Sequence, residues 1–398
     1  IMNITIALYV LAMAIAPLFW SPLSERIGRR WVYIISMAIY TITTIICGIS
    51  KNLVLFFVMR VLQGVFSSAG MTVGGGTIAD LFMAHERGKI MSLLTLGTVT
   101  GPAIGPLVGG YIAKYLGWRW IFYICTIIGG TLFLANVCFL GESLYRPNED
   151  SFLSQKNGTK KTIKERLAYL KFDPFRGLAL LLHPVALLTC LPLSISFGWF
   201  YFLVAILSPT YSEIYHFDQG SLGLLYLTGG LGNIFGALIA GFVLDRVYMR
   251  LRAKSKDGTV KAEGRLLPVL FCLPVIIAGN LMYGWFIHAR LHWFAPLVGY
   301  FLMSLGTMYG NVISTSYLVE AYIQIAASAL STANFARNLM AMVFTLISVP
   351  IRQGLGDGWA YTLSALISFG VYIICIPIVY YYAERIRNNT PSYAHKTN

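Results

Sequence analysis

The chain has 398 residues, of which 57% are hydrophobic and 12% are charged, and its mean hydropathy is +0.68. Soluble domains carry roughly 25% charged residues, and a chain of this length could not bury so much apolar surface internally. The net charge of +14 does not indicate nucleic-acid binding, because the basic residues lie in short segments between apolar runs. The composition therefore predicts an integral membrane protein.

Apolar runs long enough to cross a bilayer as helices recur along the whole chain. Eleven of them lie near residues 1–20, 31–50, 53–79, 91–113, 119–140, 182–208, 219–244, 266–288, 292–318, 326–351 and 359–382. Strands of a membrane barrel would alternate apolar and polar residues over about ten positions, whereas these runs are continuously apolar. We therefore expect an all-α polytopic fold.

The basic residues predict the orientation of these spans. Most of the 30 Lys and Arg residues fall in alternate connections, and such connections face the cytoplasm. The rule places residues 21–30, 141–178 and the C-terminus inside and residue 1 outside, so we expect one further helix and a cytoplasmic tail before residue 1. The division that follows is a helical bundle over 1–140, a cytoplasmic loop over 141–178, a second bundle over 179–384 and a tail over 385–398.

A charged segment recurs at equivalent places in the two bundles. "SPLSERIGRR" (21–30) follows the first apolar run, and "GFVLDRVYMR" (241–250) ends the second long run of the second bundle. Aligned without gaps, the pairs that match are Glu25 with Asp245, Arg26 with Arg246 and Arg30 with Arg250. This match predicts an internal repeat, which is a common feature of large transporters.

The segment at 21–30 resembles the signature of the major facilitator superfamily, Gly-x-Leu-(Ala/Ser)-(Asp/Glu)-(Arg/Lys)-x-Gly-Arg-(Arg/Lys). The matching residues are Leu23, Ser24, Glu25, Arg26, Gly28, Arg29 and Arg30, while Ser21 replaces the first glycine. The resemblance covers the whole chain. It implies two pseudo-symmetric six-helix bundles that rock about a central site, with the family's first helix missing from the present sequence.

Further motifs resemble the fungal-type twelve-helix drug/proton antiporters of that family. They are "RVLQGVFSSAG" (60–70), "GTVTGPAIGPLVGG" (97–110), "WRWIF" (118–122) and "YLVEAY" followed by "SALSTANFARNL" (317–322 and 328–339). The first is similar to the motif of proton-coupled members, and the second to a motif that antiporters carry and symporters largely lack.

Two polar clusters inside apolar runs are candidate transport sites. Arg60 lies about 10 Å into its helix, with Gln63, Gly64 and Ser67 on the same face, and an intramembrane arginine marks a functional site by default. The resemblance implies that Arg60 assists proton transfer; an arginine tied to backbone carbonyls is the structural alternative.

The second cluster repeats this spacing in another run. Asn334, Arg337 and Asn338 contact substrate in one interpretation and form interhelical hydrogen bonds in the other. Weaker candidates for the cavity are Tyr226, Asn311 and Tyr317.

Small residues form ridges on two other runs. Gly97, Gly101, Gly105 and Gly109 recur at every fourth position, which allows close helix approach, and Gly232, Gly236 and Ala240 do the same. Plain helix packing explains such ridges in part. The resemblance implies that the two helices meet between the halves, and that Pro102 and Pro106 kink the first of them and help to seal the cytoplasmic side.

The recurring charged segments predict a cytoplasmic gate. Its expected members are Glu25, Arg26, Gly28, Arg29 and Arg30 in the first half and Asp245, Arg246 and Arg250 in the second. Asp80, at the cytoplasmic end of its helix, is the expected partner of one of these arginines. We expect this latch to stabilise the outward-open state and to loosen as the bundles rock.

These features together predict a monomeric plasma-membrane exporter of small amphipathic or cationic organic compounds, driven by proton antiport. Alternatives are a proton-coupled importer and a non-transporting sensor with the same fold. No motif indicates an enzyme, a metal site or a cofactor, and the expected partners are the substrate, protons and the lipid bilayer. No Asp or Glu lies clearly at mid-membrane, so either a preceding helix carries the coupling acid or the coupling is unusual.

Overall fold

A computed structural model of the chain describes residues 2–81, 97, 101, 104–143, 180–181, 183–254, 262–322 and 326–388. The first half contains α1 (Met2–Ile15), α2 (Pro17–Ile27), α3 (Arg29–Ile49), α4 (Leu53–Leu81) and α6 (Arg119–Phe139). The second half contains α10 (Pro184–Tyr215), α11 (Gln219–Lys254), η1 (Ala262–Arg265), η2 (Leu267–Phe271), α12 (Cys272–His288), α13 (Phe294–Ala321) and α14 (Ala326–Asn388). Within these ranges there is no strand, so the predicted all-helical fold is confirmed for them.

Eight helical segments in the described ranges are long and apolar enough to cross a membrane. One of them, Ala329–Ala383, has 55 residues and would extend about 80 Å at 1.5 Å per residue, far more than the roughly 30 Å of a bilayer core. α14 therefore holds two spans, which join at Gly356, where φ is 75°. α13 covers the predicted span 292–318 but is less apolar than these eight, and most of the predicted span 91–113 lies outside the described residues.

Local sequence explains where several helices begin and end. Pro17 and Pro184 stand at the first positions of α2 and α10, where the missing N–H of proline costs nothing. α10 ends at Tyr215, and the next residue, His216, adopts the left-handed conformation with φ of 55°. The first predicted span is thus two short helices, and the candidate membrane segment Ile4–Ser24 runs through both.

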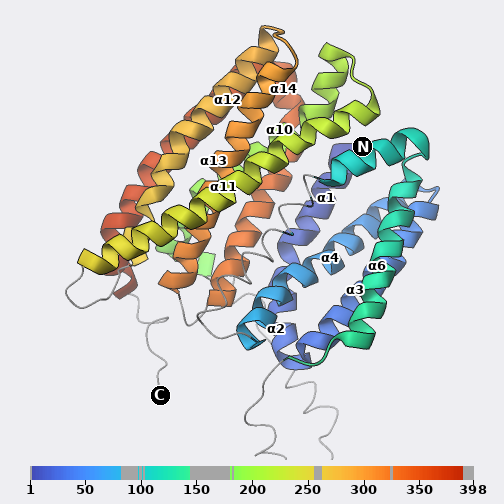
Figure 1. Cartoon of the computed structure of the whole chain (residues 1–398), viewed down its shortest axis with the longest axis horizontal. Coiled ribbons are helices and arrows are strands. Elements are labelled where there is room, and N and C mark those ends of the chain that lie inside the picture. Colours follow the sequence, from blue (N-terminus) through green and yellow to red (C-terminus); the bar gives the residue numbers. More distant parts are fainter. Residues whose placement is uncertain are drawn as a thin grey trace, which may run out of the picture.

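The helices gather into two groups (Figure 1). α1 to α6 form one group and α10 to α14 the other, and the groups meet where α1 and α2 pack against α14. A second contact joins the helical residues 104–115 to the beginning of α11. There, a Cβ built on Gly223 would lie 2.6 Å from the carbonyl oxygen of Pro106, so only glycine allows this approach.

The glycine ridge of α11 packs inside the second group. A Cβ on Gly232 would lie 2.6 Å from the carbonyl oxygen of Phe301, and Gly236 lies similarly close to the Leu305 carbonyl. The two helices that carry the ridges do meet, as expected, but at Gly223 and Pro106, whereas the ridge at Gly232 and Gly236 faces α13.

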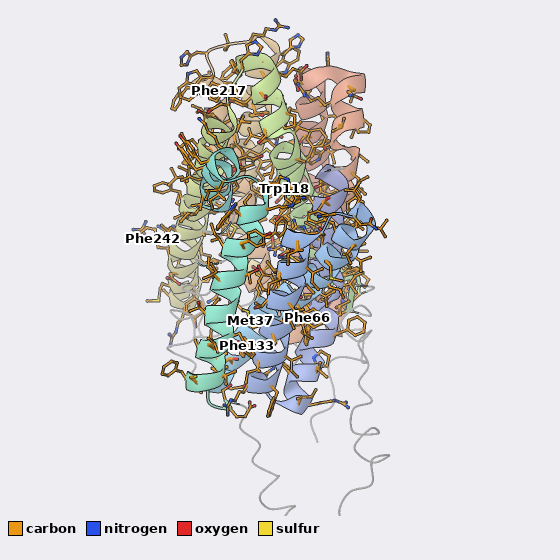
Figure 2. The ribbon with its side chains drawn as sticks, turned by 90° about the vertical axis from the view of Figure 1, so that its right-hand side faces the viewer. Met37, Phe66, Trp118, Phe133, Phe217 and Phe242 are labelled. Atoms are coloured by element: carbon orange, nitrogen blue, oxygen red, sulfur yellow. The ribbon has the colours of Figure 1, made fainter. Side chains whose placement is uncertain are left out.

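Large apolar side chains cover the outside of the helices (Figure 2). Phe242 projects from the outer edge of α11 and is 58% exposed. Ile127 on α6 is 65% exposed. A soluble monomer rarely exposes apolar surface on this scale, whereas lipid solvates it.

Candidate transport site

Arg60 lies on α4, half-buried among polar and aromatic groups. Its Nη1 donates a hydrogen bond to Oε1 of Gln63 at 2.8 Å, and Nε2 of Gln63 donates to Oγ1 of Thr44 on α3 at 2.9 Å. The guanidinium also lies 4.9 Å from the ring centre of Tyr9 on α1. These partners are all uncharged, so the positive charge of Arg60 is oriented but not neutralised by them.

α1 approaches α4 closely beside this arginine. The hydroxyl of Tyr9 donates to Oγ of Ser67 at 2.9 Å, and a Cβ on Gly64 would lie 2.7 Å from the Tyr9 carbonyl oxygen. The structure therefore gives Gly64 a packing role, because a larger residue would push α1 away. Ser67 and Gln63 bond directly to the groups around Arg60.

Arg337 lies on α14 in an aromatic setting. Its guanidinium carbon is 4.5 Å from the ring centre of Phe197 on α10, and the rings of Phe197 and Tyr201 are 5.0 Å apart. Its Nε is buried without a hydrogen-bond partner. Within the described part of the chain, Arg337 has no ion-pair partner.

The two arginines belong to one region between the halves. Tyr201, next to Phe197, lies within electrostatic range of both Arg337 and Tyr9, and Tyr9 contacts Arg60. The packing of α1 against α14 brings these two aromatic sets together. We call Tyr9, Arg60, Phe197, Tyr201 and Arg337 the arginine site.

The remaining predicted cavity residues take different positions. Asn334 and Asn338 lie half-buried on the turns of α14 that hold Arg337. Tyr226 bonds to Oγ of Ser208 at 2.9 Å between α11 and α10. Asn311 is 5% exposed, and Tyr317 is fully buried in the core of the second half.

The described carboxylates lie away from the arginine site, at the ends of helices. Their side chains belong to Asp80, Glu142, Glu213, Asp218, Asp245, Glu263, Glu320 and Asp357. Of these, five form ion pairs with Arg29, Lys114, Arg265 or Arg352. Among the described residues, none is paired with Arg60 or Arg337.

At the predicted cytoplasmic end of the first half, Arg29 and Asp80 form an ion pair. Nε of Arg29 lies 3.0 Å from Oδ2 of Asp80, and Arg29 is 7% exposed. Its guanidinium also bonds to Ser24, and a Cβ on Gly76 would lie 2.7 Å from its Cζ. The pair joins α3 to α4 within one half rather than linking the two halves.

Glu142, which the sequence motifs did not single out, provides a second carboxylate beside the Arg29–Asp80 pair. Oε1 of Glu142, just after α6, accepts the backbone N–H of Arg29 at 2.8 Å, and Oε2 accepts that of Arg30 at 3.3 Å. An acid at a helix N-terminus is favourable because it satisfies free N–H groups and the helix dipole. Gly28, with φ of 106°, leaves room for it, because a Cβ there would clash with the Glu142 carboxylate.

The other predicted gate residues of the first half are less fully described. Nη2 of Arg30 donates to the carbonyl oxygen of Val137 at 3.1 Å, which ties α3 to α6. Arg26 lies in the last turn of α2, and the side chain of Glu25 lies outside the described residues.

At the corresponding end of the second half, Arg265 and Glu320 form an ion pair. Arg265, at the end of η1, also covers the ring of Tyr248 at 4.0 Å. Arg246 lies 3.9 Å from the ring centre of its neighbour Phe242, and Arg250 is exposed. Among the described residues, Arg246 and Arg250 form no ion pair, and Asp245 lies only within electrostatic range of Arg265.

The predicted antiporter helix is only partly described. Around Gly97, Gly101 and Gly105 no described atom lies within 4 Å of a built Cβ, and at Gly109 the nearest is Cδ1 of Ile121 at 3.8 Å. Pro102 lies outside the described residues. The contact of this segment with the second half is made by the Pro106 carbonyl, so the glycine ridge is not the contact surface in the described part.

The opposite end of the molecule carries two further sets of ion pairs. Lys114, in the first half, pairs with Asp218, which precedes α11, and this hydrogen-bonded ammonium holds the pKa of Asp218 well below its usual range. Arg352 bonds to Asp357 at 2.8 Å and to Glu213 at 3.1 Å. Of these ion pairs, Lys114–Asp218 joins the two halves.

A cavity of about 450 Å³ opens between α1, α2 and α4. Its walls are apolar side chains, among them Leu8, Phe19, Trp20 and Phe66. Because it offers no charged or polar group, it can accept an acyl chain but could not hold a charged compound.

Comparisons with known proteins agree with this architecture. Residues 1–345 match the family model of the Major Facilitator Superfamily. The chain is 36% identical to the MFS-type transporter hepF of Aspergillus oryzae, covering 97% of this chain and 80% of that protein. It is 30% identical to the efflux pump radE of Floropilus chiversii, covering 96% and 73%.

A solved structure shares the fold. The crystal structure of a D-xylose-proton symporter superposes with a TM-score of 0.67 over 93% of this chain and 86% of its own, at 17% identity. At that identity the likeness concerns the arrangement of helices alone.

Proposed function

The chain belongs to the major facilitator superfamily, and from that premise we propose that this multi-pass membrane transporter exports a small amphipathic organic compound in exchange for protons. Two helical bundles would rock about the arginine site, which opens alternately to each side. We place the transporter in the plasma membrane as a monomer.

The observation that carries the proposal is the position of the arginine site. Arg60 and Arg337 come from different halves, and the contact between α1 and α14 brings their surroundings together. A group held between two moving bundles changes its surroundings during each cycle, as a transport site must. A relative named as an efflux pump and the glycine–proline motif at 97–110 favour export. Arg60, hydrogen-bonded to Gln63, is the residue we propose to assist proton transfer while remaining charged itself.

A transport assay on the chain in proteoliposomes tests this proposal. Radiolabelled amphipathic compounds are presented with an imposed pH gradient and again after an ionophore has collapsed it. We expect movement of a compound against the proton flow that disappears with the gradient. Movement in the same direction as the proton would indicate an importer, and no movement of any compound would favour a sensor.

Two variants separate a role in coupling from general damage. Arg60→Gln should abolish the dependence on the pH gradient. Arg119→Gln should leave it unchanged, because Arg119 is exposed on α6 with its guanidinium over Trp118. An equal loss of the dependence on the pH gradient in both variants would contradict the role of Arg60.

A further inference from the structure

We propose that the arginine site binds an organic anion, a single carboxylate or equally acidic group on a flat apolar body. This inference names the substrate class of the site above and rests on the proposed transport function. It narrows the substrate class predicted from the sequence, amphipathic or cationic compounds, to amphipathic anions. Cations are thereby excluded.

The first argument is the missing counter-charge. A guanidinium stays protonated in proteins, and a buried charge is costly unless it is paired. Arg60 has one neutral hydrogen-bond partner, Gln63, and the Nε atoms of both Arg60 and Arg337 are buried without a partner. Among the described residues, no carboxylate is paired with either arginine, so two positive charges face this region uncompensated.

The second argument is the contrast with other arginines in the same chain. Arg29, Arg265 and Arg352 are also largely buried, with 9%, 18% and 18% of their side chains exposed. Each of these three is paired with a carboxylate. The chain therefore neutralises these three arginines with its own acids, whereas Arg60 and Arg337, where the halves meet, have no acidic partner among the described residues. We infer that the anion that neutralises them is the cargo.

The aromatic rings around the arginines indicate the rest of the cargo. The Arg60 guanidinium lies 4.9 Å from the ring centre of Tyr9 and 5.6 Å from that of Phe122. Phe197 and Tyr201 lie beside Arg337. A guanidinium can donate two parallel hydrogen bonds to one carboxylate, while aromatic faces stack on a flat apolar body. A cation would meet two like charges in a setting of low dielectric constant.

Equilibrium binding to three matched probes tests the inference without requiring transport. The probes are naphthalene carboxylate, its carboxamide and the corresponding naphthylmethylammonium, which differ in charge but share one ring system. Isothermal titration calorimetry on the purified chain gives each dissociation constant. We expect the carboxylate to bind at least about tenfold more tightly than the amide, since hydrogen bonds to charged groups contribute about 1.5–3 kcal/mol, and the ammonium to bind most weakly.

Substitutions then assign the preference to the site. Arg337→Gln should reduce the ratio of carboxylate to amide affinity to near one, Arg337→Lys should retain part of it, and Arg119→Gln should leave it unchanged. The inference is overturned if the ammonium binds as tightly as the carboxylate, if the carboxylate fails to bind at millimolar concentration, or if Arg337→Gln keeps the ratio. A chain that prefers the carboxylate but transports nothing would contradict only the proposed export.

Discussion

Arg29 and Asp80 are joined by an ion pair of 3.0 Å that connects the first residue of α3 to the end of α4. Arg265 and Glu320 form the corresponding pair in the second half, between η1 and the end of α13. In the first half the pair fixes the end of α4 to the start of α3. In the second half it fixes the end of α13 to η1, which precedes α12. Each pair therefore lies within one half and fixes helices of that half to one another.

Charge exchange tests the first of these pairs. Arg29→Glu and Asp80→Arg should each lower the export rate roughly tenfold, because each leaves a largely buried charge beside a like charge. The double variant should recover at least part of the loss, since it restores an opposite pair. Initial export rates, corrected for the amount of protein in the membrane, provide the measurement. A double variant no better than either single variant would show that the pairing does not matter for transport.

The second half offers a comparison of two arginines. Arg265→Gln removes the partner of Glu320 and should lower both the export rate and the thermal stability. Arg250→Gln changes an exposed arginine and should alter neither. A stronger effect at Arg250 would favour the alignment of the two charged segments over the geometry of the pairs.

Glycine at position 28 can be tested against another glycine. Gly28 and Gly117 both have positive φ, 106° and 91°, but only Gly28 has a carboxylate where a Cβ would stand. Alanine at either position strains the backbone by about 1–3 kcal/mol, so the extra loss of thermal stability in Gly28→Ala measures the clash with Glu142. Glu142→Gly alone should also lower the stability, because it removes the acceptor of the Arg29 N–H, but in that background Gly28→Ala should cost no more than Gly117→Ala does in the wild-type chain. Equal losses at positions 28 and 117 would show that Glu142 does not limit the space.

The sequence predicted some of these features because they are local. Continuous apolar runs predict spans without knowledge of their neighbours, and the depth of Arg60 follows from its position in a run. The contact of Glu142 with the start of α3 joins residues more than a hundred positions apart, and no local pattern encodes it. The ridge at Gly232 was correctly identified as a packing surface, but a ridge of small residues does not specify which helix packs on it.

The repeat shows the same limit of local reasoning. The ungapped alignment placed Met249 opposite Arg29, whereas the arginine that takes the place of Arg29 in the ion pair of the second half is Arg265. In the second half α11 continues to Lys254, and the arginine of the pair lies further along the chain, at the end of η1. An alignment without gaps could not represent this difference in position.

The Lys114–Asp218 pair joins the halves at the predicted outer side. If rocking separates them, cysteines at both positions joined by a short bifunctional thiol reagent should stop export, and cleavage of the linker should restore it. Each single cysteine variant, treated in the same way, controls for the six native cysteines. Full export in the cross-linked protein would show that this contact does not open.

Acidity should affect the same pair in a defined direction. Lys114 holds the pKa of Asp218 well below its usual range, so the carboxylate remains ionised at pH values where free aspartate has gained a proton. The contribution of the pair is therefore present above the unfolded-state pKa and is lost as the pH falls through the lowered value. The difference in thermal unfolding midpoint between the wild-type chain and Asp218→Asn should therefore persist from neutral pH down to pH ~4, close to the pKa of about 3.9 of free aspartate. A difference that is already lost at pH ~5 would mean that Lys114 does not protect the carboxylate.

The stability of the empty protein provides a test of the arginine site that is independent of any ligand. Arg337 is a buried charge without an acidic partner among the described residues, so Arg337→Leu should raise the midpoint of thermal unfolding by about 2–4 °C, as a gain of about 1 kcal/mol would. Arg352→Leu should lower it, because it leaves Asp357 and Glu213 without their partner. A residue kept at a cost to stability indicates function. If the Arg337→Leu variant unfolds at a lower temperature than the wild-type chain, then the charge of Arg337 is already stabilised by a group within the protein and is not kept for binding a ligand.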